Sequence, residues 1–255
     1  MVRDMQTVAG RALRALPRQR TSLTPALFTP IFFYVVNVAS LEHIASLGQV
    51  PFEEFYLPVS IVVVAVTGAS RAGTFVGDIA TGYFDKLCVT PVRRSALLFG
   101  LMIADFVVVA CLSVPVLLIG IVHGVRFESG VLGILLFILL ASLWGLAFAG
   151  FPYALALRTG NPAVVTSAFT LFFSVAYLTT AFVPRDLLAP WLRWVSDGNP
   201  LTYLLEGLRS LVIDGWDGQA LLVAMLTVFG VGLVSMTLAL RSLSYRVRVG
   251  TQEVY

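Results

Sequence analysis

Few side chains in this sequence have the type and spacing that catalysis or metal binding requires. The two histidines, His43 and His123, are 80 residues apart, and Cys88 and Cys111 are the two cysteines. This supply is too small for a disulfide framework or a metal site. The stretch 68–77 lacks the lysine and the glycine spacing of a phosphate-binding loop, and the chain has no HExxH motif. We therefore predict no catalytic residue, metal or cofactor in this chain.

Two charges stand out because they fall inside long apolar runs. Arg71 lies near the end of the run 56–76, and Asp105 lies well inside the run 96–122. Asp105 would be ~15 Å from the start of its helix at the usual helical rise. A charge at such depth in lipid is costly unless it is paired, hydrated or able to reach the surface. Our main interpretation is an Arg71–Asp105 pair between adjacent helices. The alternatives are a cationic substrate opposite Asp105 and a neutral or hydrated Asp105.

The composition indicates the environment of these runs. The 255 residues are 58% hydrophobic and 12% charged, whereas soluble domains carry about 25% charged residues. Because one interior cannot bury so much apolar surface, lipid is the expected second apolar phase. The net charge is +3, but the basic residues lie beside apolar runs rather than in a stripe on a soluble fold. That arrangement excludes nucleic acid as a partner.

Six apolar runs are each long enough to cross ~30 Å of hydrocarbon. We therefore predict an all-α integral membrane fold, a single domain over 1–255 with six transmembrane helices. The first run contains Pro25 and Pro30 and is interpreted as a bent or tilted span. Residues 1–22 place apolar side chains opposite arginines at helical spacing, which predicts an amphipathic helix at the membrane surface. The six predicted spans are 24–41, 56–76, 96–122, 130–157, 163–183 and 218–240.

Basic residues predict the orientation. With the N-terminus in the cytoplasm, twelve lysines and arginines fall in segments 1–23, 77–95, 158–162 and 241–255, against four in the outer segments. This bias satisfies the positive-inside rule and predicts a multi-pass protein with both termini cytoplasmic.

Two segments between spans are amphipathic. In the inner segment 77–95, apolar side chains share one helical face beside Asp85 and Lys86, which predicts a surface helix that a soluble partner could contact. The outer segment 184–217 contains two apolar stripes separated by Asn199-Pro200, which predicts a pair of short helices that dip into the outer interface. A passive inner loop and a simple outer cover of the membrane surface are the alternatives.

Both segments carry a family resemblance. TGYFDKLCVTPVRRS resembles the cytoplasmic signature of type-2 ABC transporter permeases, in which a Gly-x-hydrophobic-acid-x-Leu run ends in Thr-Pro-x-x-Arg. FVPRDLLAPWLRWVSDGNPLTYLLEGLR resembles the outer signature of the same family. The order of spans and signatures also matches over essentially the whole chain. The similarity is greatest to the daunorubicin-resistance type and weaker to polysaccharide-export permeases. One departure is that residues 77–82 keep a single acid, Asp78, where the family often has a Glu-Arg/Lys-Glu-x-Gly run.

The resemblance implies a permease subunit of an ATP-driven exporter in a bacterial inner membrane. Implied partners are two copies of an ABC ATP-binding subunit, which hold ATP and Mg, a second permease that is identical or paralogous, and membrane lipid. The residues implied in ATPase coupling are Tyr83, Phe84, Asp85, Lys86, Leu87 and Pro91. Those of the outer signature are Trp191, Asn199, Pro200, Tyr203, Glu206 and Arg209.

The substrate expected from spans rich in Phe, Leu and Val is amphipathic, either drug-like or lipid-like. The candidate path residues on the fifth span are Phe169, Phe172, Phe173 and Tyr177, with lipid contact or helix packing as the alternative. Export of a polysaccharide or glycolipid by the same architecture is a second hypothesis. An ion-coupled carrier would need more intramembrane charges than Arg71 and Asp105 supply. A membrane-embedded lipid-modifying enzyme would need a His or Lys beside the outer acids, and the sequence places none there.

Overall fold

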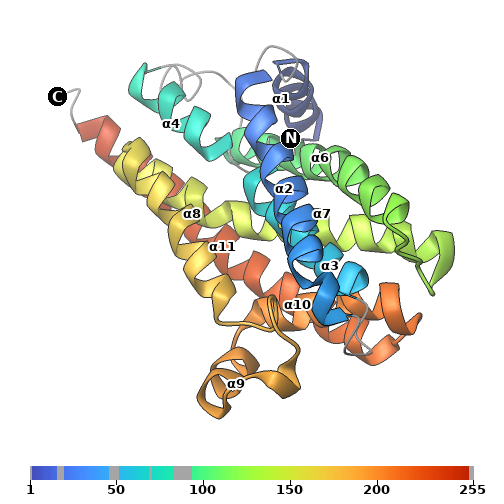
Figure 1. Cartoon of the computed structure of the whole chain (residues 1–255). Coiled ribbons are helices and arrows are strands. Elements are labelled where there is room, and N and C mark those ends of the chain that lie inside the picture. Colours follow the sequence, from blue (N-terminus) through green and yellow to red (C-terminus); the bar gives the residue numbers. More distant parts are fainter. Residues whose placement is uncertain (1, 16–19, 46–51, 69–70, 83–93, 253–255) are drawn as a thin grey trace.

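A computed structural model describes residues 2–15, 20–45, 52–68, 71–82 and 94–252 of the chain, and every regular element in these ranges is helical (Figure 1). The longer helices are α1 (Val2–Ala15), α2 (Arg20–Ala45), α3 (Phe52–Gly68), α4 (Arg71–Ala80), α6 (Arg94–Val122), α7 (Gly130–Thr159), α8 (Pro162–Tyr177) and α11 (Gly218–Gln252). Between α8 and α11 lie a 3-10 turn η2 (Arg185–Leu187), α9 (Pro190–Asp197), α10 (Pro200–Arg209) and a π-helical turn η3 (Ser210–Asp214).

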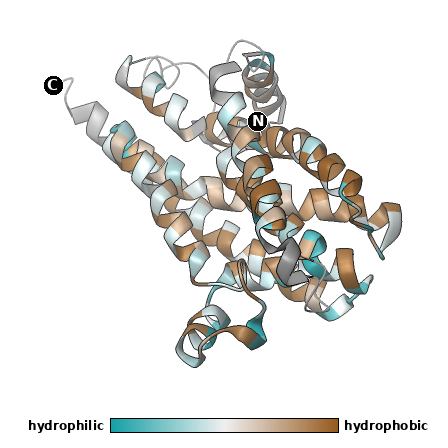
Figure 2. Cartoon of the chain, in the orientation of Figure 1, coloured by the Kyte–Doolittle hydropathy of each residue, from teal (hydrophilic) through white to brown (hydrophobic). Residues whose placement is uncertain are grey.

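Four helical stretches are long and apolar enough to cross a membrane. They are Phe52–Ile79, Ser95–Val122, Gly130–Thr159 and Gly218–Arg246. The first stretch is mostly buried inside the bundle, whereas hydrophobic residues cover outward faces of the other three as well as the faces between helices (Figure 2). This confirms the all-α class and a multi-pass membrane protein. Two shorter apolar helices, Thr24–Ser40 and Pro162–Tyr177, coincide with the first and fifth predicted spans, so the count of six stays a prediction.

The bundle is organised around α7. This helix packs against α11 along much of its length and also contacts α3, α4, α6 and α8. Small residues let α7 and α11 approach closely. Any side chain at Gly150 of α7 would clash with α11, because its Cβ would lie 2.6 Å from the Ser235 hydroxyl oxygen. The Ser235 hydroxyl in turn donates to the carbonyl of Ala147 at 2.5 Å. Small residues and interhelical hydrogen bonds of this kind are what hold helices together in lipid.

Several of the predicted span boundaries differ from the structure, and the largest difference is in α11, which was expected to end at 240 but runs to Gln252. The second span was expected to begin at 56, but α3 begins at Phe52, because Glu53 and Glu54 fit the first turn of a helix, where acids are favourable. The fifth was expected to reach 183, but α8 ends at Tyr177. Just beyond it, the Thr179 hydroxyl donates to the Ala176 carbonyl and accepts from the amide of Ala181. Such local bonds compete with continued helix.

The helix expected in residues 1–22 forms as α1 and lies along α6. A Cβ at Gly100 of α6 would come within 2.7 Å of Val8, so this glycine permits the close contact. In Figure 1, α1, α4 and the C-terminal part of α11 lie at one end of the molecule, and α9 and α10 lie at the opposite end. Both ends of the described chain are therefore at the same end of the bundle.

Candidate functional site: the outer helices, the face of α8 and a buried acid

Arg209 of the outer signature is an internal anchor. Its side chain is 9% exposed and donates to the Thr180 carbonyl at 2.8 Å and to the Phe55 carbonyl at 3.4 Å. The guanidinium carbon also lies 3.6 Å from the centre of the Phe55 ring. Burial lowers the pKa of Arg209 to about 9, which still leaves the side chain charged at neutral pH. Arg209 thus joins α10 to α3 and to the turn that follows α8.

Asn199 makes the second connection between α10 and α8. Its Oδ1 accepts from the amide of Leu201, which caps α10, and Pro200 occupies the first helical position. Its Nδ2 donates to the carbonyl of Val175 at 3.0 Å, near the end of α8. That carbonyl also accepts from the amide of Leu178, so Asn199 adds a second donor to it and ties the start of α10 to the end of α8.

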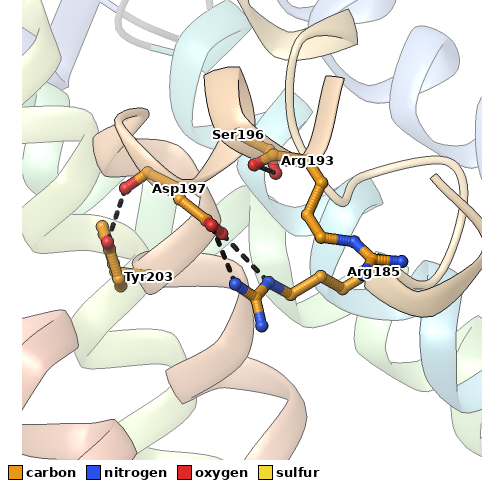
Figure 3. Close-up of polar contacts among 5 residues, drawn as sticks. All are labelled: Arg185, Arg193, Ser196, Asp197 and Tyr203. Atoms are coloured by element: carbon orange, nitrogen blue, oxygen red, sulfur yellow. Dashed lines mark hydrogen bonds and ion pairs between the residues drawn. The ribbon is translucent and has the colours of Figure 1, made fainter. Parts of the chain in front are cut away.

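Polar contacts hold the exposed helix α9 to the turn η2 and to α10 (Figure 3). Arg185 binds both carboxylate oxygens of Asp197, at 2.9 and 2.8 Å, and this interaction lowers the pKa of Asp197. The Tyr203 hydroxyl donates to the Asp197 carbonyl at 2.5 Å, and Arg193 donates to the carbonyl of Asp186 at 2.9 Å. The two arginine contacts join α9 to the preceding turn η2, and the Tyr203 contact joins α9 to the buried α10.

The remaining outer residues face the surroundings. Trp191, Trp194 and Trp216 are all more than half exposed, as expected for an aromatic belt at a membrane interface. Glu206 lies on the exposed side of α10, where partial burial raises the pKa of its carboxyl. The two short helices predicted here are present, but they differ: α10 is mostly buried in the bundle, whereas α9 protrudes from it.

Three of the four candidate path residues on α8 point into the bundle. Phe172 packs edge-on against Phe148 of α7 with ring centres 4.7 Å apart, and Phe169 lies 6.3 Å from the same ring. Phe173 packs beside Phe172. Tyr177 alone of the four is exposed, and its ring stacks on Phe182 at 4.4 Å. Within this chain, helix packing accounts for the three phenylalanines.

The exposed face of α8 carries hydroxyl groups that the sequence reasoning missed. Thr166, Thr170 and Ser174 follow one another at four-residue spacing, and Tyr177 continues the same face. Each of the three hydroxyls donates to the carbonyl four residues earlier, at 3.0, 3.5 and 3.2 Å. The oxygen lone pairs remain available on the surface. We call these four residues the hydroxyl stripe. Their four-residue spacing in the sequence is the signal that could have revealed it.

Asp105 is fully buried in α6 and accepts a hydrogen bond from Tyr153 of α7 at 2.7 Å. Tyr153 is also fully buried and packs edge-on against Phe75 of α4, with ring centres 5.5 Å apart. The side chain of Arg71 is outside the described part of the structure, so the Arg71–Asp105 pair stays a prediction. The sequence reasoning missed Tyr153, although an acid at this depth requires a donor from a neighbouring helix.

The six residues implied in ATPase coupling, 83–91, are all outside the described ranges, so that role stays a prediction. The helix that precedes them, α4, is anchored to the bundle by Phe75, Val76 and Ile79, which are buried against α7 and α8. Among the described residues no group of three His, Cys, Asp or Glu side chains is placed to hold a metal ion.

Comparison with known proteins assigns the family. A family model described as ABC-2 type transporter matches residues 3–213. A daunorubicin resistance ABC transporter permease protein of Streptomyces coeruleorubidus is 23% identical over 229 residues, covering 88% of this chain and 77% of that protein. A probable doxorubicin resistance ABC transporter permease protein of Mycobacterium tuberculosis is 24% identical over 212 residues, covering 81% and 75%. A putative transport permease of Cyanophora paradoxa is 23% identical over 222 residues, covering 82% and 74%.

The chain therefore belongs to the ABC-2 type transporter family. Its relatives are permease subunits, which are the membrane components of ABC transporters and associate with an ABC ATP-binding subunit. The multi-helix apolar bundle described above agrees with this assignment.

Proposed function

We propose that this chain is the permease of an ATP-driven exporter that moves an amphipathic, drug-like or lipid-like substrate out of the cytoplasm. Two relatives named for daunorubicin and doxorubicin resistance support export of such compounds. ATP and Mg bind in the partner subunit, two copies of which contact the 83–91 segment. The permease lies in the inner membrane of a bacterium with both termini in the cytoplasm, as the distribution of basic residues favours.

The observation that carries this proposal is the hydroxyl stripe on α8. A helix face that meets only lipid gains nothing from a line of oxygen acceptors, whereas an amphipathic substrate needs both apolar contact and hydrogen-bonding groups. The exposed ring of Tyr177 on the same face adds apolar contact, so this surface offers both. We place the path along this face, with a second permease, identical or paralogous, providing the opposite wall.

The aromatic residues have a supporting part in this proposal. Tyr177 lies at the outer end of the stripe and contacts the path, while Phe169, Phe172 and Phe173 hold α8 against the bundle from behind. The packing behind α8 fixes the rotation of this helix, so that its hydroxyls stay directed toward the path.

The test is ATP-dependent uptake of doxorubicin by inside-out membrane vesicles that contain the permease with its ATPase partner. The triple variant Thr166→Val, Thr170→Val, Ser174→Ala removes the hydroxyls with little change in volume. We expect uptake to fall about tenfold, the effect of losing ~1.4 kcal/mol of transition-state stabilisation.

The matched control is Thr237→Val on α11, whose hydroxyl also donates to the carbonyl four residues earlier, at 2.6 Å. We expect this variant to transport like the unmodified protein. Equal losses in both variants would show that the stripe has no special part. Uptake that continues without ATP would contradict the proposed ATP-driven mechanism itself.

A further inference from the structure

A long cavity of about 650 Å³ opens on the side of the bundle between α7, α8 and α11. Ligand pockets in proteins are commonly of this size. The cavity exists because α7 packs against both α8 and α11, whereas α8 and α11 have little direct contact with each other. Its rim includes the exposed side chains of Leu171 and Leu238, so the cavity is open toward the surroundings of the bundle. We call it the α7–α8–α11 cleft.

The walls of the cleft are almost entirely apolar over a considerable length. Along α7 the lining runs from Trp144 through Phe148, Phe151 and Leu155 to Arg158. At the usual helical rise this distance is about 21 Å, or two-thirds of a hydrocarbon core ~30 Å thick. The N-terminus of α10 closes the outer end of the cleft. A long, narrow and apolar cleft that opens toward lipid matches the shape and chemistry of an acyl chain.

The charged group of the cleft lies at its inner end, whereas the polar side chain at the outer end is Asn199, which caps α10. Arg158 lies in the last turn of α7 and Ser242 lies opposite it on α11. The Arg158 guanidinium also lies over the ring of Tyr245, 5.9 Å from its centre, which holds the charge at the mouth. In the proposed orientation this end is at the cytoplasmic surface, where lipid headgroups are found. A guanidinium at that level favours an anionic phosphate group.

A second copy of the chain fits this cleft less well than a lipid does. Among the residues that the structure describes, no acidic side chain lines the cleft. A symmetric interface between two copies would therefore bring two Arg158 side chains together without a countercharge from this lining. An anionic lipid supplies that countercharge directly.

The cleft and the hydroxyl stripe lie on different faces of α8. Each of the cleft residues on this helix follows a stripe residue by one position, which is about 100° around the helix. These cleft residues are Ser167, Leu171 and Val175.

We propose that the α7–α8–α11 cleft binds one anionic phospholipid of the cytoplasmic leaflet, with its phosphate at Arg158 and an acyl chain extending toward Trp144. The lipid fills the space that separates α8 from α11 and so supports the position of α8. The proposal rests on the proposed orientation of the chain in the membrane but requires no particular substrate.

Tryptophan fluorescence tests this binding directly. Trp144 is buried at the far end of the cleft, and the three other tryptophans lie in the outer segment. Replacing these three by phenylalanine (Trp191→Phe, Trp194→Phe, Trp216→Phe) leaves Trp144 as the sole reporter. The variant is reconstituted in phosphatidylcholine vesicles that contain a minority of phosphatidylglycerol. Bromine atoms, which quench tryptophan on contact, are placed on the acyl chains of either the anionic or the neutral lipid at equal total bromine.

We expect brominated phosphatidylglycerol to quench Trp144 more strongly than brominated phosphatidylcholine at the same mole fraction. Bromines deep in the chain should quench more than bromines near the headgroup, because Trp144 lies far from Arg158. Arg158→Gln should lower the preference for the anionic lipid about fivefold, the effect of one basic residue near an anionic surface.

The matched control is Arg241→Gln, which removes an exposed arginine from α11 at the same end of the molecule but outside the cleft. It should leave the preference unchanged. Equal quenching by the two lipids would overturn the proposal, since the cleft would then hold bulk lipid without selection. Absence of quenching by either lipid would also overturn it, because protein, such as a second copy, would then cover the cleft. Neither result depends on transport, so failure here is separable from failure of the exporter assignment.

Discussion

Tyr153 of α7 donates a hydrogen bond of 2.7 Å to Asp105 of α6, and both side chains are fully buried. Phe75 of α4 packs against the same tyrosine ring. Three helices therefore meet at one polar contact, and α4 is the helix that leads toward the predicted coupling segment. A movement of that segment that displaces α4 would reach α6 and α7 through this contact.

A double-mutant cycle measures the strength of this contact. Tyr153→Phe keeps the ring against Phe75 but removes the donor, and Asp105→Asn changes the acceptor. We expect Tyr153→Phe to destabilise the protein by ~1–3 kcal/mol, because it leaves a buried acceptor without this partner. The cycle should give a coupling energy of about 0.5 kcal/mol or more, measured from thermal unfolding in detergent. The exposed Tyr245→Phe serves as the control, and additive effects of the two buried variants would refute the contact.

The planar guanidinium of Arg209 predicts that lysine cannot replace it. Arg209→Lys keeps the charge but loses the fork that reaches the carbonyls of Thr180 and Phe55 and the stacking on Phe55. We expect the free energy of unfolding to fall by ~2–3 kcal/mol, which is the cost of leaving one or two buried acceptors unpaired. The exposed Arg126→Lys should change stability little. If both variants melt at the same temperature as the unmodified protein, the anchoring role of Arg209 is wrong.

A graded series at Asn199 separates its two bonds. Asn199→Asp keeps an acceptor that caps α10 but removes the Nδ2 donor to Val175, whereas Asn199→Ala removes both. Hydrogen exchange at the end of α8 should be faster in both variants. Exchange at the start of α10 should be faster only in Asn199→Ala, where loss of the cap costs about 1 kcal/mol. Identical exchange patterns in the two variants would show that the bonds do not act separately.

The Arg185–Asp197 ion pair predicts the acid response of α9. Because Arg185 lowers the pKa of Asp197 below its ordinary 3.8, the stabilisation is present above that value and is lost as pH falls through the lowered pKa. The fluorescence of Trp191 and Trp194 should therefore stay constant from neutral pH to about 5 and change only in stronger acid. Asp197→Asn should abolish the transition. A transition centred at pH 3.8 or above in the unmodified protein would show that the pKa of Asp197 is not lowered.

Hydropathy predicted much of the fold and less of the site, for a physical reason. The helices α6 and α7 are long apolar runs, so their extents were predicted to within two residues, whereas α11 continues to Gln252, beyond the predicted end at 240, because its last turns are polar. In lipid, however, the outward face of a helix is as apolar as the inward face, so sequence periodicity does not identify the packed side. This is why Phe172 was assigned to a path although it packs on α7. The same limit hid the partnership between Asp105 and Tyr153, which depends on how two helices are rotated.

The outer signature was recognisable for the opposite reason. Asn199-Pro200 has a local structural meaning, a capped helix start, which the sequence alone conveys. What the sequence could not convey is that Asn199 and Arg209 also bind the end of α8 and the turn beyond it, since both contacts join segments more than 20 residues apart.

The central claim is that this permease works with a separate ATP-binding subunit, and purification of the tagged chain in mild detergent tests it most directly. The same purification is carried out on a variant with both charges reversed at Asp85 and Lys86. A control variant has both charges reversed at the outer residues Asp186 and Arg193. We predict that a nucleotide-binding protein co-purifies with the unmodified chain and with the outer control but is lost from the Asp85/Lys86 variant. A chain that purifies alone in every detergent, yet transports substrate into vesicles without ATP, would contradict the account.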